Sequence, residues 1–159
     1  MPRKAKARLL YGSISTSERV SSLGAGGALI YTWLLAHADD QGRYNGSAKK
    51  VKAEVVPLLD EITIGDVDNA LDAMVEGGLI IRYEAGKTQL IQIVDWWEFQ
   101  AGLRVRNESR YPAPEGWQDN IKLPPEQGRD NTGKYRRVNI ETGEVGQGGE
   151  QGRTRRTLL

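Results

Sequence analysis

The chain has 159 residues, which is enough for one domain with an appendage and too few for two ordinary domains. Hydrophobic residues make up 38% of the chain and 19 residues are glycine, so only part of the chain is expected to build a core. The lack of cysteine excludes disulfides, thiolate metal sites and cysteine nucleophiles, and it is consistent with a cytoplasmic protein. No run of about 18 apolar residues is present, so we expect no membrane partner.

The net charge of +1 conceals an uneven distribution along the chain. Residues 1–103 contain 11 basic and 13 acidic side chains, whereas residues 104–159 contain 11 basic and 8 acidic ones. The N-terminal arm and lead-in, residues 1–22, begins with four basic residues before any acid: Arg3, Lys4, Lys6 and Arg8. Basic ends therefore flank a mildly acidic middle.

The first predicted helix covers residues 28–38, ALIYTWLLAHA, and is expected to be central and buried because it is apolar on nearly every side. Serines and threonines in the preceding ISTSERVSS (14–22) indicate a loop or a short lead-in. The glycine-rich GAGGAL (24–29) lacks the pattern of a phosphate-binding loop and indicates a flexible helix start. After this helix, residues 42–44 leave room only for a turn or one short strand.

Two further helices and a hairpin are predicted next. Ser47 is a good N-cap for a helix over about 48–56, which Pro57 ends. Thr63 caps a helix over about 64–76, whose apolar residues follow the 3.6-residue period until the glycines at 77 and 78 end it. Residues 79–83 and 88–94 are rich in β-branched side chains and indicate a hairpin.

The chain changes character after the hairpin. Trp96 and Trp97 could stack on unpaired bases, but packing beneath the hairpin is the favoured interpretation because large aromatics in small domains are mostly buried. From residue 104 the chain is a basic tail rich in proline and glycine, and we expect mostly disorder from about residue 119.

The order helix, short strand, helix, helix, hairpin is that of a winged helix-turn-helix, an α+β fold with three helices and a β-hairpin wing, here over residues 23–103. The runs LIYTWLLAHADDQGRYNGSAKKVKAEVVP and EITIGDVDNALDAMVEGGLIIRYEAGKTQLIQIVDWWEFQ resemble the N-terminal domain of phage and prophage replication proteins of the replisome-organiser type. The similarity covers about residues 9–111. It implies DNA binding during replication initiation and recruitment of a replication or host protein.

The stretch LLAHADDQGRYNG (34–46) raises the question of catalysis or metal binding. His37 is the only histidine and has no second ligand at helical spacing, and the adjacent carboxylates of Asp39 and Asp40 would point in different directions. We therefore predict a turn that ends the helix. No nucleophile–base set, metal cluster or cofactor loop is found elsewhere, so the sequence favours a protein that is not an enzyme and uses no cofactor.

Basic residues define a candidate footprint for DNA. They come from the N-terminal arm, the predicted short strand, the 48–56 helix, the hairpin tip and the start of the tail. The set is Arg3, Lys4, Lys6, Arg8, Arg43, Lys49, Lys50, Lys52, Lys87, Arg104 and Arg106. Contacts of this kind hold the backbone with steep salt dependence and little base specificity. A plain role of these charges in solubility is the alternative.

The 64–76 helix carries an acidic outer face, although the equivalent helix of a helix-turn-helix normally enters the major groove. Its polar residues are Asp66, Asp68, Asn69, Asp72 and Glu76. Phosphates would repel this face, so it is predicted to bind a protein partner or a second copy in a homo-oligomer. A solvated face without a partner is the alternative.

Three functions remain open. The first is a phage-type DNA-binding protein in replication initiation. The second is a protein-interaction module, such as a phage-encoded adaptor or inhibitor of a host nucleic-acid machine, that uses the acidic helix. The third is a transcriptional regulator, which is disfavoured because the 64–76 helix has no Arg, Lys, Gln or Ser to read base edges.

Overall fold

The structure is a computed structural model that describes residues 7–103, 106–121, 137–138 and 145–146. The residues up to Asn120 form one compact unit, and those from Ile121 onward form a second. In the second unit, β4 (Arg137–Val138) and β5 (Val145–Gly146) pair in antiparallel fashion. Most of the tail that was predicted to be disordered lies outside the described residues. No helix in the described ranges has the length and apolar character needed to cross a membrane.

The N-terminal part of the first unit is helical, with a 3-10 helix η1 (Gly12–Thr16), α1 (Glu18–Ser21) and α2 (Gly24–His37). Of the two alternatives predicted for residues 14–22, a loop or a short lead-in, the loop is therefore wrong, because most of these residues are helical. The Ser17 hydroxyl accepts a hydrogen bond from the backbone N–H of Val20 and so caps α1. The helix α2 starts earlier than expected, at Gly24, and is buried on one face only, since Trp33 on the other face is 41% exposed.

The next two helices lie close to their predicted bounds. After β1 (Arg43–Asn45) comes α3 (Ala48–Val55), with Ser47 at the N-cap position but without a side-chain cap bond. The helix α4 (Ile64–Glu76) begins with the predicted Thr63 cap, whose hydroxyl accepts from the N–H of Asp66. Gly78, at φ 71°, follows its end.

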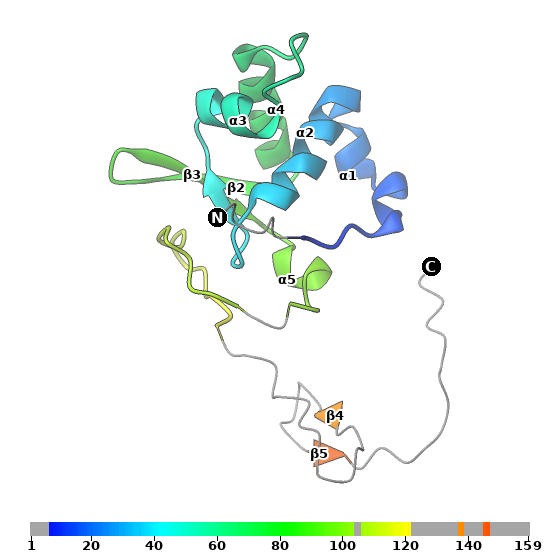
Figure 1. Cartoon of the computed structure of the whole chain (residues 1–159), viewed down its shortest axis with the longest axis vertical. Helices are drawn as coiled ribbons and strands as arrows, with labels where there is room; N and C mark the ends of the chain where they lie inside the picture. Colours follow the sequence, from blue (N-terminus) through cyan, green and yellow to red (C-terminus); the bar gives the residue numbers. More distant parts are fainter. Residues whose placement is uncertain (1–6, 104–105, 122–136, 139–144, 147–159) are drawn as a thin grey trace, which may run out of the picture. The chain divides into compact units, whose positions relative to one another are not determined.

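The hairpin strands β2 (Ile80–Ala85) and β3 (Thr88–Ile93) join β1 in an antiparallel sheet of order β1-β3-β2. The short helix α5 (Trp96–Phe99) follows β3. The hairpin extends away from the helices on the side opposite α1 (Figure 1). The first unit is thus α+β, with five α-helices and a three-stranded antiparallel sheet in the described residues.

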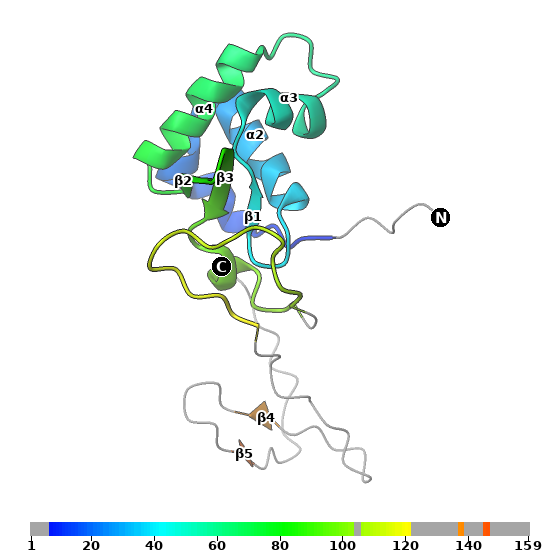
Figure 2. The same cartoon turned by 90° about the vertical axis from the view of Figure 1, so that its left-hand side faces the viewer.

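The core lies between the helices and one face of the sheet (Figure 2). Its fully buried members include Leu34 of α2, Val51 of α3, Val67 and Leu71 of α4, and Ile91 of β3. These residues occupy the positions expected from helical and strand periodicity. The packing therefore follows the apolar pattern of the sequence.

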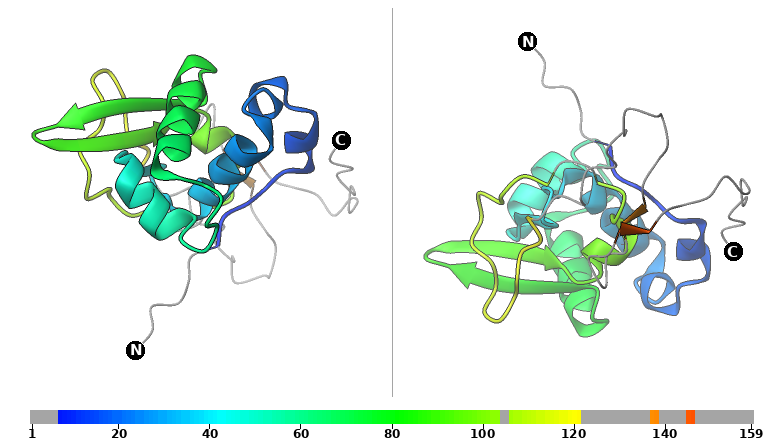
Figure 3. Two further views of the ribbon diagram at one scale, coloured as in Figure 1. Left: turned by 90° about the horizontal axis from the view of Figure 1, so that it is seen from above. Right: turned by 90° about the horizontal axis from the view of Figure 1, so that it is seen from below.

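The other face of the sheet is covered by residues 106–120, which we name the strap (Figure 3). Register places Arg43 opposite Gln92 and Asn45 opposite Leu90, and alternation puts these residues on the face away from Ile91. Leu90 is 1% exposed although it is not part of the main core cluster. The compact unit thus continues past residue 103, where the domain was expected to end. The apolar pattern of the sequence did not indicate this extension, because polar contacts hold the strap.

Candidate nucleic-acid interface

An open groove lies between α3 and the β2–β3 hairpin. Lys49 and Lys50, in the first turn of α3, line it from one side, and Lys87, at the hairpin tip, lines it from the other. All three side chains are exposed. The fold thus gathers three predicted DNA-binding lysines, from segments about 37 residues apart, around one concave surface, where their positive potentials add.

The remaining residues that line the groove are uncharged, except for one acid that already has partners within the protein. Its neutral polar members are amides and hydroxyls, which commonly bond phosphates and sugars: Asn45, Ser47, Thr88 and Gln89. Ala53 supplies an apolar patch, and Glu54 is the only acid in the lining. Glu54 accepts a hydrogen bond from the Tyr44 hydroxyl and lies 3.6 Å from the Lys50 ammonium. Burial, together with the bond to Glu54, raises the pKa of Tyr44.

Lys52, another predicted DNA contact, is not among the residues that line this groove. Its ammonium donates to the carbonyl oxygens of Val56, at 3.0 Å, and Leu59, at 2.7 Å. These carbonyls follow the last turn of α3, where they have no partner within the helix. Lys52 therefore holds the α3–α4 turn together.

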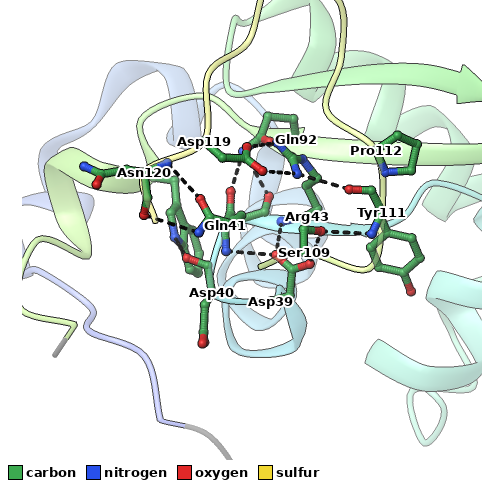
Figure 4. Close-up of polar contacts among 12 residues, drawn as sticks. Asp39, Asp40, Gln41, Arg43, Gln92, Ser109, Tyr111, Pro112, Asp119 and Asn120 are labelled. Atoms are coloured by element: carbon green, nitrogen blue, oxygen red, sulfur yellow. Dashed lines mark hydrogen bonds and ion pairs between the residues drawn. The ribbon is translucent and has the colours of Figure 1, made fainter. Parts of the chain in front are cut away.

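Arg43 also leaves the predicted footprint, because its side chain is 1% exposed beneath the strap. It pairs with the carboxylate of Asp119 through both terminal nitrogens, and its Nε donates to Gln92 Oε1 at 2.9 Å. Its Nη1 also donates to the Tyr111 carbonyl at 3.1 Å. A buried guanidinium needs such partners, so Arg43 anchors the strap and does not reach a phosphate (Figure 4).

Two other predicted contacts are engaged within the protein. Arg8 has a side chain that is 4% exposed, donates to Asp40 Oδ1 at 3.0 Å and lies over the Trp96 ring at 5.3 Å. Arg106 lies over the Trp97 ring at 4.5 Å, and burial lowers its pKa. Neither arginine is placed at the groove. The predicted contacts that lie outside the described residues are Arg3, Lys4, Lys6 and Arg104.

The acidic face of α4 is partly neutralised by Arg82, a residue of β2 that sequence reasoning missed. Its guanidinium bonds Asp68 at 2.8 Å and Asp72 at 3.0 Å. Because β2 follows α4 and packs against it, only the three-dimensional fold brings this arginine to the helix. Asn69 and Glu76 remain exposed, as predicted partner-binding residues require.

Asp66, a third predicted partner-binding acid, has a local role. Its carboxylate accepts from the backbone N–H of Thr63 at 2.9 Å and completes a capping box. This bond favours the ionised form and lowers the pKa of Asp66. The residue therefore stabilises the start of α4, whatever else it binds.

The predicted turn at the end of the helix is confirmed, and both of its acids are engaged; Figure 4 shows the contacts of Asp39. Asp39 Oδ1 accepts from the N–H groups of Gln41 and Arg43, and the Gly42 N–H bonds the Asp39 carbonyl at 3.0 Å. Asp40 accepts from Asn107 Nδ2 at 2.7 Å. In the described part of the chain, no three His, Cys, Asp or Glu side chains are placed to hold a metal ion.

The two tryptophans after β3 pack within the domain. Trp96 is 1% exposed, and its Nε1 donates to the Asp40 carbonyl at 2.9 Å, so the core interpretation is confirmed for this residue. Trp97 is half-buried beneath Arg106. Neither ring belongs to the groove lining, which contains no aromatic side chain.

Comparison of the chain with protein-family models, with curated proteins and with solved structures found no match.

Proposed function

We propose that the protein binds the backbone of DNA in the groove between α3 and the hairpin, and that its first unit is a winged helix-turn-helix. The observation that carries this proposal is the convergence of Lys49, Lys50 and Lys87 on one groove. The element order supports the fold assignment, with α3 and α4 as the helix-turn-helix and the β2–β3 hairpin as the wing. Duplex DNA is the favoured form, because the lining offers no ring on which an unpaired base could stack.

A role in replication initiation is the part of the proposal that rests on the sequence resemblance. In this role the groove holds the backbone without reading bases, and α4 faces a protein instead of entering the major groove. The charge on α4 supports this division, because Arg82 neutralises only part of the charge of Asp68 and Asp72. Phosphates close to α4 would still meet a net negative helix.

The test is fluorescence anisotropy of full-length protein with duplex and single-stranded DNA, over about 50 to 200 mM salt. A variant with Lys49→Ala, Lys50→Ala and Lys87→Ala is expected to lose affinity for every duplex sequence alike. If each lysine neutralises one phosphate, the slope of log affinity against log salt falls by about 2 to 3.

The matched control is Arg19→Gln, which removes a cation from α1, on the side of the molecule away from the hairpin (Figure 1). The Arg19 side chain is 51% exposed. This variant is expected to leave the slope unchanged. Equal losses in the control and the triple variant would refute the groove as the binding site.

A protein-interaction module remains the second candidate, and one observation favours it. Ile64 and Val75 are 48% and 41% exposed on α4, the helix that also presents Asn69 and Glu76. Substituting Val75→Lys and Glu76→Lys together would replace an apolar and an acidic side chain on this surface by two basic ones. Loss of a protein complex with retained DNA binding would assign α4 to the partner, and no effect on any complex would leave DNA binding as the function.

A further inference from the structure

The turn between α3 and α4, residues 56–62, holds a leucine out in solvent. Leu58 is 88% exposed, while its neighbours Leu59 and Ile62 pack against the core. The backbone of this Leu58 turn is fixed by Lys52, whose ammonium bonds the carbonyls of Val56 and Leu59. The Ile62 N–H also bonds the Leu59 carbonyl, at 3.0 Å. An apolar side chain on a turn that is already ordered loses little conformational entropy on docking.

Two acids flank this leucine. Asp60 and Glu61 are both exposed, and neither takes part in an ion pair among the described residues. The acids of α4 differ in this respect, because Arg82 bonds two of them. The Leu58 turn therefore presents an apolar tip beside two charges that are free to pair with a partner.

The groove between α3 and the hairpin has the complementary character. It has an apolar patch at Ala53 and three exposed lysines around it, Lys49, Lys50 and Lys87. Lysine stems add further apolar surface while their ammonium groups stay in water. A leucine flanked by two carboxylates matches an apolar floor flanked by three ammonium groups.

We infer that the Leu58 turn of one molecule docks into the α3–hairpin groove of a second copy. Leu58 would contact Ala53 and the lysine stems, and Asp60 and Glu61 would face the lysine ammonium groups. A molecule cannot fill its own groove, because the turn directly follows α3, the rigid helix that forms the groove wall. The contact is heterologous, so a pair of copies keeps one free turn on one molecule and one free groove on the other, and the assembly can grow head to tail.

This inference uses the groove proposed for DNA but does not depend on DNA binding. Duplex and the Leu58 turn would compete for the same lysines, so DNA is expected to dissolve the assembly. Both contacts are electrostatic in part and weaken as salt rises. The Leu58 turn itself lies outside the groove lining, which allows the two activities to be separated by substitution.

The experiment is sedimentation velocity of full-length protein at low salt, comparing wild type with two variants. Leu58→Ser removes the tip, and Lys49→Glu with Lys50→Glu reverses the groove. For each variant alone, the affinity of self-association is expected to fall at least about tenfold, since either a buried leucine or a charge pair is lost. Leu58 is almost fully exposed, so its substitution should leave the circular dichroism and the melting temperature unchanged.

Mixing the two variants gives the decisive result. The groove of the Leu58→Ser variant is intact, and so is the turn of the groove variant, so the mixture should form 1:1 dimers that grow no further. Wild type that is monomeric at all concentrations, or self-association that survives both variants, would overturn the inference. In parallel, Leu58→Ser should retain DNA affinity and the groove variant should lose it. DNA binding that fails in wild type would refute the proposed function while leaving the mixing result interpretable.

Discussion

Removing the carboxylate of Asp119 tests whether the strap is an integral part of the domain. In the Asp119→Ala variant, Arg43 loses the partner of both terminal nitrogens while its side chain stays 1% exposed. Breaking a fully buried ion pair in this way costs about 3 to 5 kcal/mol. Here Asp119 is 29% exposed and Arg43 keeps its bonds to Gln92 and Tyr111, so we expect a smaller loss, about 2 to 3 kcal/mol.

The assay is urea denaturation, which yields the free energy of unfolding of wild type and variants. Glu115→Ala is the matched control, because it removes another carboxylate from the strap at an exposed position and should cost less than about 0.5 kcal/mol. Limited trypsin digestion supplies an independent readout, since Arg110 is exposed and the backbone of a loosened strap fits the protease more readily, which speeds cleavage after this residue. If Asp119→Ala is no more destabilising than Glu115→Ala, the pair with Arg43 does not hold the strap.

Two further predictions concern backbone and cap. Gly42→Ala is expected to lower the free energy of unfolding by about 3 kcal/mol or more, because φ is +80° and the new Cβ would lie 2.6 Å from Trp96 Cγ. The control Gly86→Ala, at φ +64° with no atom within 4 Å, should lower it by only about 1 kcal/mol. Equal urea midpoints for the two would contradict this. Asp66→Ala should destabilise the protein at neutral pH. Because the pKa of Asp66 is lowered from 3.8 by its bond to Thr63, that difference should persist above about pH 4 and vanish as pH falls through the folded pKa. A difference that is constant with pH would contradict the capping role.

The helices and the hairpin could be predicted because their apolar residues follow a period that packing then satisfies. In α4, both bounds followed from the Thr63 cap and the glycines at 77 and 78. The helical residues 12–21 were missed, since short helices capped by serine have the same composition as a polar loop. The strap was missed for a related reason: its segment is poor in apolar residues, and most of its hydrogen-bond partners lie 66 to 79 residues away.

Charge alone identified part of the candidate site. Lys49, Lys50 and Lys87 were named from the sequence, and the fold brings them to one groove. Lys52 and Arg43 carry the same charge in the same region, yet they bond carbonyls and a carboxylate inside the unit. The composition gives the number of cations but does not say which of them already have a partner in the fold. For the same reason, the sequence did not indicate that Arg82 pairs with acids of α4.

The distance along the chain between Arg43 and Asp119 sets an order of events during synthesis. They are 76 residues apart, so at about 5 to 20 residues per second a ribosome needs about 4 to 15 s to make the second partner after the first. Once β3 is complete at Ile93, the polar face of the sheet has no strap for the rest of that interval, and the core between the helices and the other face can form without it. The domain is therefore expected to mature in two stages, an apolar stage followed by a polar closure that waits for residue 120.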